Sequence, residues 1–163
     1  MTRPKNIDSP ISPNIKHVLL ADDDIDDCNF FKEALEGYQE RTMFTIVNDG
    51  EQLIDLLITI EHLPDVIFLD INMPRKNGVE CLTEIKRHKR LEAIPVIIFT
   101  TTFERGVVDL MYQKGAHYFI CKPGEFLQFK KIIQQSLILL ANGEIAQPHK
   151  EHFVLKVANT RAA

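Results

Sequence analysis

Side chains suited to phosphoryl chemistry end four of the hydrophobic runs in this sequence. Two carboxylates end the first run, one carboxylate the second, a hydroxyl the third and an ammonium the fourth; they belong to Asp22, Asp23, Asp70, Thr100 and Lys122. If these runs are neighbouring parallel strands, their carboxyl ends share one edge of a sheet, where open α/β sheets bind ligands. That edge would suit a divalent metal ion and a phosphoryl group.

Three carboxylates at one edge need a compensating cation. Two charges 4 Å apart repel by about 1 kcal/mol in water, and several-fold more at a lower effective dielectric constant. All-oxygen ligation favours a hard ion, and a few carboxylates completed by carbonyl, water and phosphate oxygens are typical of Mg²⁺. Asp70 could keep one oxygen on the metal while the other attacks phosphorus, which gives an aspartyl phosphate. Lys122 and Thr100 could then stabilise the transferred group.

Simpler structural roles are open for several of the polar residues. Asp24, Asp26 and Asp27 fit helix capping and the favourable field at a helix N-terminus. For Thr100, a strand-end hydroxyl bonded to nearby backbone explains the residue as well as a role in phosphoryl binding does. Lys122 fits an ion pair with an aspartate, which would still place it at the same site. Capping does not account for the other carboxylates, because they stand at the strand ends themselves.

Strand and helix patterns alternate from residue 15 onward. We expect strands at 17–21, 43–47, 65–69, 95–99 and 117–121, and helices at 25–37, 50–61, 78–89, 103–114 and 125–141. Five such repeats indicate an α/β fold with a parallel sheet and helices on both faces.

Several helix ends carry sequence signals. Asp49, Asn77 and Thr101 each precede Gln or Glu by three residues, which is the capping-box spacing. Gly115 and Gly143 stand where left-handed C-caps are expected. These signals support the alternating pattern at its boundaries.

Composition and length describe one ordinary domain with flanking segments. The chain has 163 residues, 45% of them hydrophobic and 26% charged, with a formal net charge of -4 that offers no basic field for nucleic acid. No apolar run approaches the roughly 20 residues of a membrane helix, and no signal peptide is recognisable, so we expect a cytoplasmic protein. The three cysteines, Cys28, Cys81 and Cys121, fall in apolar patterns and are expected to be buried free thiols. We expect a flexible leader at 1–14, a domain at 15–141, and a tail at 142–163 that could add a short edge strand.

Four sequence elements, taken in order, match a known family. Asp22-Asp23, the segment Leu-Asp-Ile-Asn-Met-Pro-Arg-Lys-Asn-Gly at 69–78, Thr100 and Lys122-Pro123 resemble the receiver domain of bacterial response regulators over about residues 15–141. The resemblance implies a flavodoxin-like, doubly wound (βα)5 sandwich of three layers, with strand order 2-1-3-4-5. Asp22 and Asp23 would then face Asp70 across the crevice between the first and third strands.

The resemblance also implies roles for individual residues. Asp70 would be the phosphoacceptor. Asp23 and Asp70 would ligate Mg²⁺ directly, Asp22 would act through water, and Asn72 would contribute its backbone carbonyl. Thr100 would clasp the phosphoryl group after transfer.

The same resemblance covers the fifth strand. Lys122 would pair with a phosphoryl oxygen, and the Lys122–Pro123 bond would be cis. Phe119 takes the position of an aromatic switch that is often Tyr, so a ring switch is expected to act with Thr100 but without a tyrosyl hydroxyl contact. Thr101 is bulkier than the small residue often found there.

We therefore expect a stand-alone receiver that is not a conventional enzyme, although it assists its own phosphorylation and dephosphorylation. A sensor histidine kinase would supply the phosphoryl group. Output would pass by protein contact or by onward transfer to a histidine phosphotransfer protein, and the chain could also form a homodimer. The motif at 70–74 and the tail are similar to regulators encoded beside phytochrome-like kinases.

Two other classes remain for comparison. A haloacid-dehalogenase-like phosphatase also uses an aspartate nucleophile with Mg²⁺, but it carries a second aspartate two residues later, where this chain has Asn72. A pseudo-receiver or flavin-binding module would only bind; the intact set of five residues opposes the first, and the acidic first loop would repel a flavin phosphate.

Overall fold

The computed structural model describes residues 15–38, 42–143 and 146–158, so the expected leader at 1–14 lies outside the described residues. Strands and helices alternate along the chain. Their bounds are β1 His17–Ala21, α1 Ile25–Leu35, β2 Met43–Val47, α2 Gly50–Thr59, β3 Val66–Leu69, α3 Gly78–Arg87, β4 Val96–Thr100, α4 Arg105–Gln113, β5 Tyr118–Cys121 and α5 Phe126–Ala141, followed by the short 3₁₀ helix η1 Lys150–His152. The predicted α/β alternation is confirmed.

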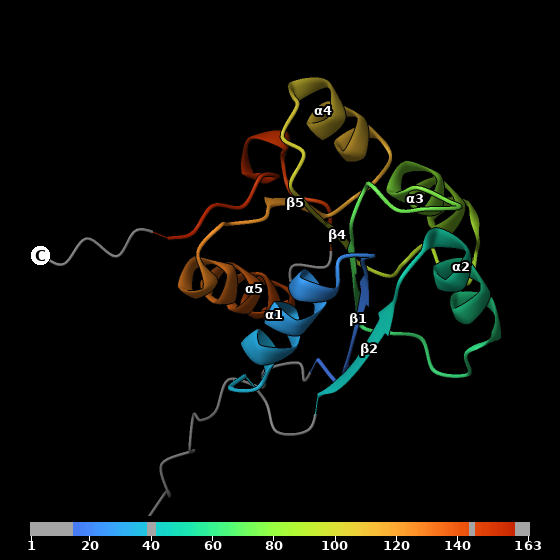
Figure 1. The fold of residues 1–163 in the computed structure, drawn as a ribbon. Coiled ribbons are helices and arrows are strands. Elements are labelled where there is room, and N and C mark those ends of the chain that lie inside the picture. Colours follow the sequence, from blue (N-terminus) through green and yellow to red (C-terminus); the bar gives the residue numbers. More distant parts are fainter. Residues whose placement is uncertain (1–14, 39–41, 144–145, 159–163) are drawn as a thin grey trace, which may run out of the picture.

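All five strands form one parallel sheet. Its order is β2-β1-β3-β4-β5, as the resemblance implied. The winding reverses between β1 and β3, which pair with Ala21 opposite Leu69. Figure 1 shows α1 and α5 together against one face and α2 and α3 against the other. The reversal therefore lies in the middle of a sheet that is covered on both sides.

Alternate residues of each strand enter two separate cores. Leu19, Ile67, Ile98 and Phe119 pack with α2, α3 and α4 on one face. Their strand neighbours, with Phe68 and Phe99 among them, pack with α1 and α5 on the other face. Both sets are apolar because parallel strands are buried on both sides. This packing fixes the register of the strand ends.

Most predicted helix caps are present. The Asp24 side chain accepts from the backbone N–H of Asp27, Asp49 caps α2, and Asn77 forms a complete capping box with Glu80. The cap predicted at Thr101 is wrong. Helix α4 begins only at Arg105, after an N-cap residue whose side chain makes no capping hydrogen bond. The segment between β4 and α4 is therefore longer than predicted.

Glycines close two helix ends. Gly115 follows α4 with φ of 95° and Gly143 follows α5 with φ of 86°, the left-handed backbone expected from the sequence.

Gly78 opens α3 against the backbone that carries Asp70. A Cβ atom at Gly78 would overlap the carbonyl oxygen of Asp70 and lie 2.7 Å from Cα of Ile71. We expect Gly78→Ala to lower the free energy of unfolding by about 2 kcal/mol, because backbone cannot yield as a side chain can. Urea denaturation measures the change. Gly106→Ala is the matched control, since nothing lies within 4 Å of a Cβ atom at Gly106. Equal stability of the two variants would contradict this.

The structure corrects the expectation for one cysteine and specifies how the tail contacts the sheet. Cys28 and Cys81 are buried free thiols as predicted, but Cys121 is exposed because it ends the edge strand β5. The alternating segment at 152–157 makes a single parallel bridge, Val154 with Phe119. No helix within the described residues has the length and apolar character needed to cross a membrane.

Candidate functional site

Three carboxylates from β1 and β3 meet where the winding reverses. Because Ala21 and Leu69 are opposite in the register, the residues that follow them lie side by side. Oxygen atoms of Asp22, Asp23 and Asp70 all lie within 4.8 Å of one another. The predicted convergence of distant acidic residues is therefore present in the fold.

Asp22 is the most enclosed of the three. Its side chain has no exposed surface, and it accepts hydrogen bonds from the Asp24 N–H at 2.9 Å and from Lys122 Nζ at 2.7 Å. Burial raises the pKa of Asp22 to about 6, although these hydrogen bonds act in the opposite direction. A buried carboxylate of this kind gains from a nearby cation.

Asp22 should give the metal-free protein a pH-dependent stability. Its pKa is about 6 in the folded chain against an ordinary value of 3.8, so between these values the folded state holds a proton that the unfolded state has lost. Stability from this group therefore falls as the pH rises through that interval. We expect the free energy of unfolding of Asp22→Asn, relative to the wild type, to increase from about pH 4 to about pH 7 in urea titrations with EDTA. A difference that stays constant would contradict the assignment.

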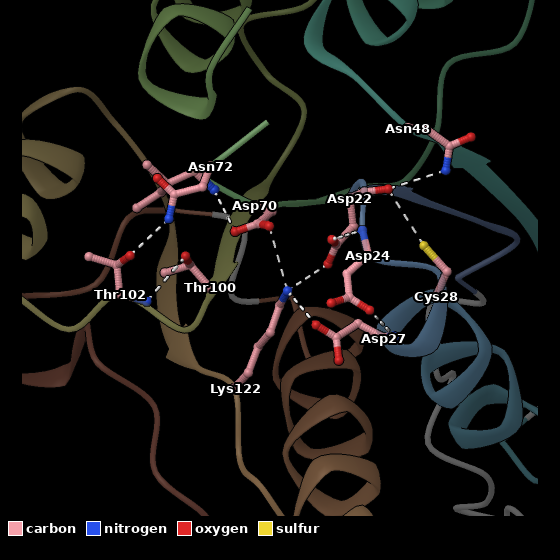
Figure 2. A network of polar contacts seen from close by, with 11 residues as sticks. Asp22, Asp24, Asp27, Cys28, Asn48, Asp70, Asn72, Thr100, Thr102 and Lys122 are labelled. Carbon is pink, nitrogen blue, oxygen red and sulfur yellow. Dashed lines mark hydrogen bonds and ion pairs between the residues drawn. The ribbon is translucent and has the colours of Figure 1, made fainter. Parts of the chain in front are cut away.

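Lys122 bridges the carboxylates. Figure 2 shows its ammonium between Asp22, Asp27 and Asp70, at 2.7, 2.9 and 3.6 Å from their oxygens. The side chain is only 5% exposed. Burial opposes the charged form, but the hydrogen bonds that Lys122 donates to Asp22 and Asp27 outweigh it and raise the pKa of Lys122 above its usual range. The ammonium is therefore charged at neutral pH and stands within one small movement of Asp70.

Asp27 also belongs to this site, although the sequence favoured only a structural role for it, in capping or in the field at a helix N-terminus. Its carboxylate holds Lys122 from the first turn of α1. A signal was present in the sequence, because Asp27 lies four residues before Phe31 on the face of the helix that packs against the sheet. Asp26, one residue earlier, is exposed.

Asp70 is nearly buried and held by the backbone. It is 6% exposed, and one carboxylate oxygen accepts from the Ile71 N–H at 2.8 Å. The other oxygen faces Lys122 at 3.6 Å. One oxygen of Asp70 is thus fixed, while the other lies beside the ammonium.

Thr100 and Asn72 lie beside Asp70 (Figure 2), and of Asn72 only the backbone carbonyl was predicted to act in the site. Thr100 is fully buried at the end of β4, and its hydroxyl oxygen accepts from the Thr102 N–H at 3.4 Å. The Asn72 side chain donates to the Thr102 hydroxyl at 3.0 Å (Figure 2). The alternative of a backbone-bonded hydroxyl at Thr100 is thus present in this state.

The structure tests the cis bond expected after the fifth strand, whereas the switch at Phe119 stays a prediction. The Lys122–Pro123 bond is trans, so the expected cis bond is wrong for this structure; trans is also the intrinsically favoured isomer. Phe119 is fully buried, with its ring centroid 6.3 Å from that of Phe103 and 6.2 Å from that of Phe153.

The donor set fits a small divalent cation. It consists of carboxylate oxygens only, and the three acidic residues carry more negative charge than one ammonium balances. Hard cations prefer such oxygen ligands, and Mg²⁺ typically takes one or two carboxylates with waters and a phosphate oxygen. The arrangement is suited to hold a metal ion and a phosphoryl group side by side.

Comparison with known proteins agrees with the fold and identifies the family. Residues 18–134 match the family model of the response regulator receiver domain, and the chain belongs to this family. Receiver domains act in phosphorelay signalling and bind divalent cations at an acidic pocket. The resemblance drawn from the sequence motifs is confirmed.

Individual relatives include single-domain regulators. The polar-differentiation response regulator DivK of Brucella ovis is 30% identical over 122 residues, covering 75% of this chain and 96% of DivK. The response regulator Rcp1 of Synechocystis is 28% identical over 124 residues, covering 73% of this chain and 84% of Rcp1.

Solved structures give the same result. The phosphorylated cyanobacterial phytochrome response regulator RcpA has a TM-score of 0.73 at 27% identity, covering 77% of this chain and 94% of RcpA. The Mn²⁺-bound form of Rcp1 has a TM-score of 0.71 at 26% identity, covering 82% of this chain and 99% of that one.

Proposed function

We propose that this protein is a phosphorelay receiver in which Asp70 accepts a phosphoryl group from a phosphohistidine of a sensor histidine kinase. The observation that carries the proposal is the meeting of three carboxylates within 4.8 Å beside a buried ammonium. We assign the receiver to residues 15–141. The membership of the chain in the receiver family supports this function.

The transfer step is an in-line substitution at phosphorus. The free oxygen of Asp70 forms the new P–O bond as the P–N bond to the kinase imidazole breaks, and the departing imidazole keeps the electron pair and takes up a proton. Lys122 moves from its position 3.6 Å from Asp70 to contact a phosphoryl oxygen. Its charge offsets the negative charge that spreads over the equatorial oxygens.

We infer a Mg²⁺ site in which Asp23, Asp70 and the backbone carbonyl of Asn72 are ligands and Asp22 acts through water. When bound, the ion would supply charge neutralisation for the incoming phosphoryl group. The related Rcp1 has a Mn²⁺-bound form, which supports binding of a divalent ion by this chain. Asp22 also keeps Lys122 close by, since its carboxylate holds both the ammonium and the start of α1.

We infer that the output begins at Thr100. After transfer, its hydroxyl would donate to a phosphoryl oxygen instead of only accepting from Thr102, and Phe119 would respond on the adjacent strand. Adding roughly two negative charges to a receiver site is enough to bias a two-state surface. The altered surface would bind a downstream protein, or Asp70 would pass the group to a histidine phosphotransfer protein.

The related phytochrome response regulators suggest the kind of kinase. RcpA is described as a phytochrome response regulator, and other structural relatives as bacteriophytochrome response regulators. We propose a kinase of similar type as the phosphodonor. Phosphotransfer from such a kinase, measured against unrelated kinases, tests this choice.

Incubation with acetyl phosphate and Mg²⁺ tests the function. Intact mass spectrometry should show one added phosphoryl group that is lost on mild alkaline treatment and does not form in EDTA. Steady release of phosphate from unrelated esters would instead indicate a phosphatase, and a yellow purified protein would indicate a flavin module. Either result without the labile adduct would overturn the proposal.

A further inference from the structure

The segment 147–158 lies along the outer edge of β5. The Phe119 N–H donates to the Phe153 carbonyl at 3.0 Å, and the Leu155 N–H donates to the Phe119 carbonyl at 2.9 Å. These two bonds flank the bridge between Phe119 and Val154. In Figure 1 the red segment that carries η1 runs beside β5 and α4. An extended peptide adds to a sheet edge through the same kind of hydrogen bonds.

One aromatic side chain anchors this segment. Phe153 is fully buried, with its ring centroid 5.1 Å from that of Tyr112 in α4 and 6.2 Å from that of Phe119. Among the described residues of the segment, only Phe153 is buried. The groove therefore recognises one aromatic ring together with an extended backbone.

Polar groups of α4 and the loop after it hold the start of the segment. Gln147 Nε2 donates to the carbonyls of Tyr112 and Ala116, both at 2.7 Å. The Tyr112 hydroxyl donates to the Pro148 carbonyl at 3.0 Å. Lys150 forms an exposed ion pair with Asp109 at 2.9 Å. These contacts set the direction in which the segment enters the groove.

The far end of the segment lies against α5. The Gln135 side chain on α5 donates to the Lys156 carbonyl at 3.1 Å and accepts from the Ala158 N–H at 3.2 Å. A cavity of about 430 Å³ lies between residues 154–157 and Phe103, with Lys122 and Pro123 in its wall. The segment thus forms one wall of a cavity next to the lysine that contacts Asp70.

We propose that the edge of β5 between α4 and α5 is a peptide-binding groove, which the chain fills with its own residues 147–158. The outside partner that fits it is an extended protein segment with an aromatic anchor, and this partner must displace the chain's own segment. Displacement exposes one fully buried side chain, Phe153, together with the partly buried Val154, Leu155 and Val157. It opens two backbone hydrogen bonds to Phe119, so local opening does not require unfolding of the sheet. The inference does not depend on phosphoryl transfer.

A synthetic peptide can replace the segment in a full-length variant. Phe153→Ser removes the anchor, so the groove should then bind a dye-labelled peptide of residues 146–158 in fluorescence anisotropy. The wild type should bind this peptide at least about tenfold more weakly, because an attached segment competes at millimolar effective concentration. A control peptide with Ser in place of the phenylalanine should bind neither protein. Circular dichroism and thermal unfolding establish that the variant is folded.

Equal binding to both proteins, or no binding to a folded variant, would overturn the proposal. A wild-type dimer in light scattering that dissociates in the variant would also overturn it, because the segment would then lie on a second copy.

Hydrogen exchange of the wild type provides a second test if the variant does not fold. The amides of Phe119 and Leu155 should exchange well before those of β4. Protection of these two amides equal to that of β4 would show that the segment is not displaceable.

Discussion

Asp70→Asn should abolish the labile phosphoryl adduct formed with acetyl phosphate and Mg²⁺. The amide oxygen of asparagine is a poor nucleophile and carries no charge, so the rate of adduct formation should fall by at least about 100-fold. The shape is retained, and the amide oxygen can still accept from the Ile71 N–H. Intact mass against time measures the rate.

Asp55→Asn is the matched control for this variant. Asp55 is an exposed aspartate in α2, away from the three converging carboxylates. This control should form the adduct at the wild-type rate. Wild-type yield of a single adduct in Asp70→Asn would remove Asp70 from its proposed role.

Lys122→Met should slow phosphorylation strongly without removing the nucleophile. Loss of one positioned charge that stabilises a transition state typically costs about 100- to 1,000-fold in rate. Methionine has a similar length and suits the buried position over Phe99, where the ammonium lies 5.5 Å from the ring centroid. Adduct formation at saturating Mg²⁺ measures the effect, because the metal still balances part of the carboxylate charge.

A second readout separates this role from a general loss of stability. Lys122→Met leaves the buried carboxylate of Asp22 and the half-buried carboxylate of Asp27 without their ammonium partner. Mg²⁺ should therefore raise the melting temperature of this variant more than that of the wild type. Lys131→Met, an exposed change on α5, should alter neither rate nor melting temperature. An unchanged phosphorylation rate in folded Lys122→Met would contradict the mechanism.

The sheet and the convergence of the acidic residues were predictable from the sequence because both follow from parallel pairing. Buried strands such as Val66–Leu69 are continuous apolar runs, and the next polar residue of each run must emerge at the same edge. The strand order came from the family resemblance, since apolar periodicity does not distinguish one neighbour from another.

Other features depend on tertiary contacts that local patterns do not encode. Thr101 has the same capping-box spacing as Asn77, yet α4 starts only at Arg105. The local sequence does not distinguish a helix cap from a longer loop, so the later start could not be predicted. Asp27 satisfies the rules for a helix N-terminus, so the sequence did not predict its ion pair with Lys122, which is 95 residues away. The single bridge of Val154 depends on the unpaired edge of β5, which only the strand order reveals.

Chemical mapping of the adduct tests the phosphoacceptor role most directly. Borohydride reduces an aspartyl phosphate to homoserine, and peptide mass spectrometry then locates the altered residue. The proposed mechanism predicts that the wild type, phosphorylated with acetyl phosphate and Mg²⁺, carries this change at Asp70 alone. A change at Asp22 or Asp23, or a stable phosphate on a serine, threonine or tyrosine, would contradict it.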